Sequence, residues 1–257
     1  MMIAHKTLIF IPTFNERGNV ERMTTEVLAL DIDADLLFID DNSPDGTGEL
    51  LDRLASQHSR VRVVHREAKR GIGSAHLDGI LFAYSHGYTR LVTMDCDFTH
   101  SPSLIPELLA AADTADVLVG SRYAKHGSLP DWTLFRKALT VSGHFLTQRL
   151  LGIPQDATSG FRFYNLARIP QELFDLVTSR GYSFFFESLV ILKNNGFAIR
   201  DVPATLSPRV HGQSKMNVRE IVKSARMLVS LYVTEKTNPA RLQVKAPGRA
   251  HSGSAAR

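Results

Sequence analysis

An apolar run followed at once by two acidic residues, RLVTMDCDFTH, occupies residues 90–100. Aliphatic and β-branched side chains that lead into a polar turn are typical of a buried strand. Four further runs of this kind occur at residues 7–11, 35–39, 60–64 and 116–119. Helical-looking stretches separate these runs. Strands that alternate with helices predict an α/β fold with a mostly parallel central sheet.

The composition is that of an ordinary globular protein. Hydrophobic residues make up 44% and charged residues 22% of the 257 positions, which disfavours disordered and fibrous classes. Lys plus Arg exceed Asp plus Glu by 30 to 26, but four of the basic residues follow Asn238, so the rest of the chain carries 26 of each sign. The basic excess therefore does not predict a nucleic-acid partner, and residues 238–257 are expected to form a disordered basic tail.

The sequence shows no membrane span and no secretory signal. A spanning helix needs about 18 consecutive apolar residues. The longest such run near the C-terminus, residues 228–233, is interrupted by Ser230. The single cysteine, Cys96, cannot form an internal disulfide. We therefore expect a cytoplasmic protein.

Polar residues follow the first two expected strands, and ligands of open parallel sheets bind beyond such strand ends. The first strand leads into PTFNE, residues 12–16, which lacks the glycines of a dinucleotide-binding turn. Taken alone, this segment is a strand stop and a helix cap. The second leads into DDNSPDG, residues 40–46. Its three acids either serve a turn or accept hydrogen bonds from a nucleoside.

Asp95 and Asp97 follow the strand in residues 90–94. In extended chain this spacing turns both carboxylates toward one side. Such a pair can hold one Mg²⁺ together with a diphosphate, and the ion then stabilises the departing charge. The alternative is a pair of solvated loop acids, and His100 is an additional candidate ligand.

Two cations precede two glycines in KRGIG, residues 69–73, at the start of an expected helix over residues 74–87. A helix N-terminus with nearby cations attracts phosphate. A simple turn into the helix explains the glycines equally well.

Taken in order, five of these segments resemble the family 2 glycosyltransferases. They are PTFNE (12–16), DDNSPDGT (40–47), KRGIG (69–73), DCD (95–97) and GSRY (120–123). Further segments are similar to the dolichyl- and polyprenyl-phosphate mannosyltransferase branch, namely residues 132–137, 156–164, 179–182 and 209–215. The resemblance extends from about Leu8 to Val233, and the ordered set is more specific than any single motif.

The resemblance implies a single GT-A domain over residues 1–237. Residues 1–120 would form its nucleotide-sugar-binding half and residues 121–237 its acceptor-side half. Patterns in the second half predict helices near residues 133–151, 166–177, 182–195 and 217–234. The last of these carries an apolar stripe, which either packs on the domain or lies at a membrane interface.

The resemblance also implies the site residues. Those that bind the nucleotide sugar would be Pro12, Phe14, Glu16, Ile39, Asp41, Lys69, Asp95, Cys96, Asp97, Arg122, Arg209 and Lys215. Mg²⁺ or Mn²⁺ would be held by Asp95, Asp97 and Thr99. The acceptor phosphate would contact Arg122, Arg136 and Thr140, and the catalytic residues would be Asp97, Arg122 and Arg209. The chain departs from the usual family residues at Phe14, Cys96 and Thr99, where Tyr, Ala and Gln or Ser are common.

The implied reaction transfers mannose from GDP-mannose to a polyprenyl or dolichyl phosphate at the cytoplasmic face of a membrane, where a membrane-anchoring partner is compatible with the sequence. A phosphate monoester has a second pKa of about 6 and needs no general base at neutral pH. We expect one displacement that inverts an α-linked donor to a β-linked product. The alternatives are a polyprenyl-phosphate glucosyltransferase that uses UDP-glucose and a catalytically silent nucleotide-sugar-binding subunit.

Overall fold

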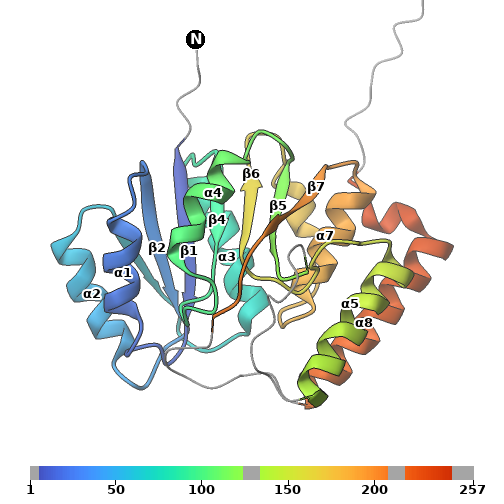
Figure 1. Ribbon diagram of the computed structural model, residues 1–257, viewed down its shortest axis with the longest axis horizontal. Coiled ribbons are helices and arrows are strands. Elements are labelled where there is room, and N and C mark those ends of the chain that lie inside the picture. Colours follow the sequence, from blue (N-terminus) through green and yellow to red (C-terminus); the bar gives the residue numbers. More distant parts are fainter. Residues whose placement is uncertain (1–5, 124–133, 208–217, 245–257) are drawn as a thin grey trace, which may run out of the picture.

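The structure, a computed structural model, describes residues 6–123, 134–207 and 218–244, without the side chains of residues 134–139. Within these residues, seven strands form one central sheet (Figure 1). The strands are β1 (Thr7–Thr13), β2 (Ala34–Asp40), β3 (Val61–His65), β4 (Arg90–Thr93), β5 (Val117–Ser121), β6 (Arg162–Asn165) and β7 (Ile199–Pro203). Their order is β3-β2-β1-β4-β6-β5-β7, and β6 runs antiparallel to both of its neighbours. The expected α/β class with a mostly parallel sheet is confirmed.

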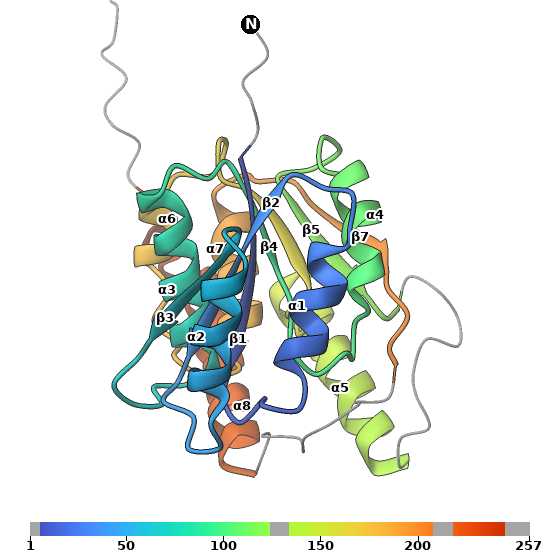
Figure 2. The same ribbon diagram turned by 90° about the vertical axis from the view of Figure 1, so that its left-hand side faces the viewer.

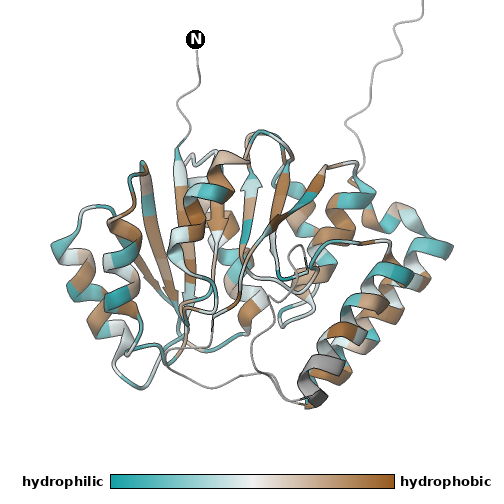
Figure 3. Ribbon diagram, in the orientation of Figure 1, coloured by the Kyte–Doolittle hydropathy of each residue, from teal (hydrophilic) through white to brown (hydrophobic). Residues whose placement is uncertain are grey.

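Helices cover both faces of the sheet (Figure 2). One core contains side chains of α3 (Ile72–Ser85), α6 (Glu172–Asp175) and α7 (Phe184–Asn194). The other core contains side chains of α1 (Val20–Leu28), α2 (Thr47–Gln57) and α4 (Ile105–Ala110). Burial on both faces explains why β1, β2 and β5 read as continuous apolar runs rather than alternating ones. Figure 3 shows this apolar character along the strands.

Two long helices, α5 (Leu134–Leu151) and α8 (Val218–Thr237), lie side by side at one end of the sheet (Figure 1). Leu228 and Leu231 of α8 are buried in the core that contains α3 and α7. Both helices begin on the side of the molecule where the parallel strands end. Two short 3₁₀ turns, η1 (Pro102–Leu104) and η2 (Pro239–Leu242), complete the described elements. None of the helices described is both long enough and apolar enough to span a bilayer.

The five expected strands and most of the expected helices are confirmed, but the helix expected over residues 166–177 is wrong. Residues 166–171 form turns, and the helical part is only the four residues of α6. Pro170 explains the difference, because proline lacks an amide hydrogen and disfavours helical backbone at the residue before it. Strands β6 and β7 were not expected. They are short, and β6 begins with the fully buried Arg162, so neither gives a periodic apolar signal.

Glycine at position 73 allows α3 to approach the loop that precedes α7. A Cβ atom on Gly73 would lie 2.6 Å from the Gly181 carbonyl oxygen and 3.0 Å from the Arg180 carbonyl carbon. The Ser74 amide donates a hydrogen bond to the Arg180 carbonyl at 3.1 Å. The glycines of the KRGIG segment therefore serve close backbone packing at the helix entry.

We expect Gly73→Ala to lower the free energy of unfolding by about 1–3 kcal/mol, because the new methyl group meets main-chain atoms. Gly143→Ala in α5 is the matched control. A Cβ there meets no atom of the described residues within 4 Å, so the better helix propensity of alanine should stabilise the protein by about 0.5–1 kcal/mol. Urea unfolding followed by circular dichroism measures both changes. A Gly73→Ala protein as stable as the wild type would contradict the packing role.

Candidate active site

The carboxyl ends of β1, β2 and β4 lie next to one another, because these strands are neighbours in the sheet. The loops that follow them contain the three non-glycine residues with positive φ among those described, Asn15 (56°), Asn42 (57°) and Phe98 (61°). Such backbone is sparsely populated and occurs preferentially at functional sites. This edge of the sheet is therefore the candidate active site.

Hydrogen bonds join the loops after β1 and β2. The Asn15 amide donates to the Ser43 hydroxyl at 2.9 Å, and the Glu16 amide donates to the Thr47 hydroxyl at 3.0 Å. Pro12 and Ile39 are paired in register on the two strands. The Glu16 carboxylate accepts a hydrogen bond from the Asn19 amide group at 2.8 Å. Four of the expected nucleotide-binding positions are thus brought together at one site: Pro12, Phe14, Glu16 and Ile39.

Two of the three acids in the segment at residues 40–46 maintain its turn. Asp40 accepts hydrogen bonds from the Ser43 hydroxyl at 2.6 Å and the Ser43 amide at 2.9 Å. Asp45 accepts from the Thr47 hydroxyl at 2.6 Å and the Arg17 amide at 3.2 Å. Burial raises the pKa of Asp45, but these hydrogen bonds outweigh it and lower the pKa overall. The turn interpretation of the segment is therefore confirmed for Asp40 and Asp45, and the nucleoside interpretation stays a prediction for Asp41.

Asp41, the third acid of the segment, makes none of these hydrogen bonds within the turn and is the candidate for binding a ligand. It is buried, and its Oδ1 accepts a hydrogen bond from the Arg66 guanidinium at 2.6 Å. Burial raises the pKa of Asp41, and the positive charges of Arg66 and Lys69 oppose this rise. The Lys69 ammonium lies 3.7 Å from the centroid of the Phe14 ring. Phe14, Asp41 and Lys69, from the loops after three different strands, thus surround one place, as expected for a nucleoside site.

The acidic pair after β4 has oxygen atoms suited to a divalent cation. Asp97 is buried and its Oδ1 accepts a hydrogen bond from the Thr99 amide at 3.0 Å. The Thr99 hydroxyl is buried and finds no hydrogen-bond partner within the described part of the chain. An orphaned hydroxyl on the residue whose amide contacts Asp97 fits the expected ligand set of Asp95, Asp97 and Thr99. Among the described residues, no three or more His, Cys, Asp or Glu side chains are grouped so that they could hold a metal by themselves.

Cys96 and His100 are packed inside the protein. The Cys96 side chain is buried in the core that contains α1 and α4, so contact with a nucleotide would come from its main chain. The His100 ring stacks on Phe161 with centroids 5.2 Å apart. Burial, together with the nearby Arg122, lowers the pKa of His100 to about 4. His100 is therefore a neutral imidazole at physiological pH.

A buried ion pair lies at the end of β5. The Arg122 Nε and Nη2 atoms donate to the two oxygens of Asp156 at 2.6 and 3.1 Å, and Nη2 also donates to the Thr158 hydroxyl at 3.0 Å. Burial lowers the pKa of Arg122, but Asp156 more than compensates and raises it overall. Asp95 and His100 also interact with Arg122 electrostatically. This arginine therefore stands beside the acidic pair, charged and held in a fixed orientation.

Tyr123 connects this ion pair to α5. Its hydroxyl donates to the Thr140 carbonyl at 3.2 Å, and its ring stacks on His144 with centroids 3.9 Å apart. Thr140 is thus brought toward Arg122. Arg136 precedes Thr140 by four residues on α5 and so shares a helix face with it. The side chain of Arg136 lies outside the described residues, as do Arg209 and Lys215 in their entirety.

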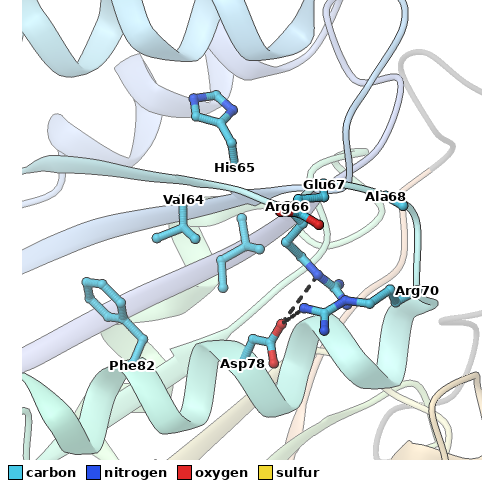
Figure 4. A pocket seen from close by; sticks show the side chains of 9 residues that line it. Val64, His65, Arg66, Glu67, Ala68, Arg70, Asp78 and Phe82 are labelled. Atoms are coloured by element: carbon cyan, nitrogen blue, oxygen red, sulfur yellow. Dashed lines mark hydrogen bonds and ion pairs between the residues drawn. The ribbon is translucent and has the colours of Figure 1, made fainter.

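Sequence reasoning missed two residues of this site, Arg66 and Asp156. Arg66 follows β3 directly, and Asp156 begins one of the segments that carry the resemblance. Neither has a local pattern that reveals its partner. A cavity of about 410 Å³ lies beside Arg66, between the ends of β2 and β3 and helix α3 (Figure 4). Ile39 is the expected nucleotide-binding residue among those that line it.

The sequence is similar to those of known proteins. The model of the glycosyl transferase family 2 matches residues 8–172. The polyprenol monophosphomannose synthase of Mycolicibacterium smegmatis is 38% identical over 221 residues, which cover 84% of this chain and 83% of that protein. The undecaprenyl-phosphate mannosyltransferase of Micrococcus luteus is 34% identical over 213 residues, which cover 82% of this chain and 88% of that protein.

Solved structures give the same fold. The glucosyl-3-phosphoglycerate synthase of Mycobacterium tuberculosis, in complex with Mn²⁺, UDP and glucosyl-3-phosphoglycerate, matches with a TM-score of 0.62 at 19% identity. The match covers 90% of this chain and 80% of that chain. A second structure of that enzyme, with Mg²⁺ and UDP, matches with the same TM-score over 90% of this chain and 79% of that chain. The expected GT-A fold is confirmed.

Proposed function

The chain belongs to the family 2 glycosyltransferases, and from this premise we propose that it transfers mannose from GDP-mannose to a polyprenyl phosphate, a dolichyl-type lipid. The observation that carries the proposal is the position of the Arg122–Asp156 pair next to Asp95 and Asp97 at one edge of the sheet. That edge presents acids suited to a metal-bound donor beside a fixed cation suited to an anionic acceptor. The names of the two curated relatives support mannose as the sugar and a polyprenyl phosphate as the acceptor.

On the donor side, Phe14, Asp41 and Lys69 would bind the nucleoside. An aromatic ring stacks on a base, a carboxylate accepts hydrogen bonds from base nitrogens, and an ammonium neutralises phosphate. Asp97, with Asp95 and Thr99, would hold Mg²⁺ or Mn²⁺, which supplies neutralisation of the charge on the leaving diphosphate. The metals in the structures with UDP support this choice of ion.

On the acceptor side, Arg122 would orient the attacking phosphate. Its Nε and Nη2 atoms donate to Asp156 and Thr158, so its Nη1 group would donate to a phosphate oxygen, and the positive charge would strengthen that hydrogen bond. The phosphate is already mostly dianionic at neutral pH, because its second pKa is about 6. It therefore attacks the anomeric carbon without a dedicated general base, and inversion of an α-linked donor gives a β-linked product.

The test is transfer of radiolabelled mannose from GDP-mannose to a short polyprenyl phosphate in the presence of Mg²⁺ or Mn²⁺. Label in the lipid phase and a β-linked product by NMR are expected. Transfer of label from UDP-glucose alone would identify the protein as a glucosyltransferase. An α-linked product would refute the inverting mechanism. No transfer from either donor would favour a nucleotide-sugar-binding subunit that acts with another protein.

Helices α5 and α8 would place the site at the cytoplasmic face of a membrane. Among the described residues, eight of the nine exposed large hydrophobic side chains lie on these two helices. They are Val141, Phe145, Leu146, Val218, Val222, Val229, Tyr232 and Val233. An apolar surface of this kind is suited to the interface of a bilayer. Leu228 and Leu231 of α8 pack on the domain, and the exposed residues of the same helix would contact the membrane.

We expect the double variant Phe145→Ser, Val229→Ser to bind vesicles of anionic lipid at least about 10-fold more weakly than the wild type. Burial of each apolar side chain in a membrane contributes about 1.5–3 kcal/mol to the free energy of binding. Both are more than half exposed, at 57% and 56%, so folding should be unaffected. Leu81→Ser on α3 is the control, and co-sedimentation is the measurement. Equal binding by the double variant would exclude these helices as the membrane contact.

A further inference from the structure

Arg66 contacts Asp41 and is almost completely buried. Its Nη1 donates to Asp41 Oδ1 at 2.6 Å, and its side chain is only 3% exposed. Its Nη2 donates to the Ser74 hydroxyl at the start of α3. Its main-chain amide donates to the Asp40 carbonyl at 2.9 Å. The main chain and both ends of the guanidinium are therefore fixed.

Figure 4 shows how this arrangement continues. Asp78 on α3 lies 3.3 Å from the Arg66 Nε atom and 2.8 Å from the Arg70 Nη2 atom. Arg66 thus lies between two carboxylates, and Asp41 is the one at the nucleoside site. The Asn42 side chain also donates to the Glu67 carbonyl at 2.9 Å, which ties the loop after β2 to the residue that follows Arg66. The Asp41 carboxylate is therefore held by Arg66, which follows β3 and contacts α3.

We propose that Arg66 is a positioning residue for nucleobase recognition: it holds the Asp41 carboxylate ionised and oriented to accept hydrogen bonds from a base that carries a ring N–H, guanine in the proposed donor. This inference rests on the proposed function. A carboxylate offers about four lone-pair sites, so the bond to Arg66 leaves acceptors for the base. Guanine presents N1–H and an adjacent amino group, whereas N1 of adenine is an acceptor that an ionised carboxylate repels.

The ionisation of Asp41 depends on its neighbours. Burial and the adjacent Asp40 raise its pKa, whereas Arg66 and Lys69 lower it. Removal of Arg66 takes away the closest of the opposing charges, so the pKa of Asp41 must rise further. Protonated Asp41 then becomes more abundant as the pH falls, and a protonated carboxyl group donates a hydrogen bond where guanine also donates. Nucleotide binding should therefore become weaker at lower pH in a protein without this arginine.

The experiment is calorimetric titration of the full chain with GDP and ADP at pH 6 and pH 8. Arg66→Gln should bind GDP about 10- to 100-fold more weakly than the wild type, as for loss of a hydrogen bond between charged groups. The loss should be larger at pH 6 than at pH 8, and the preference for GDP over ADP should shrink. Arg62→Gln is the matched control, because this arginine lies on β3, the strand that Arg66 follows, but pairs with Asp35 at 3.9 Å. This variant should leave all values unchanged.

Arg66→Lys keeps the inference falsifiable if Arg66→Gln does not fold, and Asp41→Asn gives a second test if it does. Arg66→Lys retains the charge but cannot contact Asp41 and Ser74 with paired donors. It should therefore bind GDP more tightly than Arg66→Gln but more weakly than the wild type, and its affinity should change little between pH 6 and pH 8. In Asp41→Asn, which removes the charge that Arg66 acts on, the added change Arg66→Gln should cost little further affinity. Full additivity of these two changes would overturn the inference.

This inference alone is overturned by the following result. The wild type binds GDP, and the folded Arg66 variants show the same affinity, the same pH dependence of affinity and the same preference for GDP over ADP. Binding of UDP in place of GDP by the wild type would refute the proposed donor. The same comparison with UDP would then decide the role of Arg66, because uracil also carries a ring N–H. A wild type that binds no nucleotide would overturn both proposals.

Discussion

Asp97→Asn is expected to lower the rate of mannosyl transfer by about 1,000-fold while the protein remains folded. An asparagine oxygen can still accept the hydrogen bond that Asp97 Oδ1 receives from the Thr99 amide at 3.0 Å. The variant therefore removes the negative charge and keeps this hydrogen bond. A metal that stabilises the leaving diphosphate contributes several kcal/mol to the transition state, and about 4 kcal/mol corresponds to three powers of ten in rate.

The measurement is initial rate with GDP-mannose and a short polyprenyl phosphate over a range of Mn²⁺ concentrations. Asp113→Asn is the control, because that side chain is 83% exposed and lies away from the site, next to Arg90. It should retain wild-type activity. If Asp97→Asn kept more than about a tenth of the activity at every metal concentration, Asp97 would not be the principal metal ligand. The melting temperature of Asp97→Asn should match that of the wild type.

Arg122→Gln is expected to destabilise the protein as well as to stop the reaction. The Asp156 side chain is 1% exposed and receives two hydrogen bonds from the guanidinium, at 2.6 and 3.1 Å. Removal of one member of a buried ion pair costs about 3–5 kcal/mol, because the other charge is left uncompensated. Chemical unfolding should show a loss of this size.

The second substitution Asp156→Asn should separate the two effects. The double variant has no uncompensated charge, so most of the lost free energy of unfolding should return. Mannosyl transfer should stay low, because the cation for the acceptor phosphate is still missing. Recovery of activity together with stability would show that Arg122 serves folding alone and would remove it from the acceptor site.

The local pattern of the chain was sufficient for much of the site. The acids after β4 and the polar turns after β1 and β2 were identified because strand ends carry a sharp change from apolar to polar residues. Which acid does what was not identifiable in this way. Asp40, Asp41 and Asp45 lie within six residues, and only their hydrogen-bond partners separate the two that hold the turn from Asp41, the one proposed to bind the nucleoside.

The sequence by itself determined the fold class, the first five strands and the family, because these depend on local periodicity and on the order of motifs along the chain. Only the tertiary structure decided the pairings of Arg66 with Asp41 and of Arg122 with Asp156. These partners are 25 and 34 residues apart. They meet because β3 lies beside β2 and because β6, an antiparallel strand that the sequence did not reveal, lies between β4 and β5. Strand order results from packing between distant segments, and no local pattern of side chains encodes it.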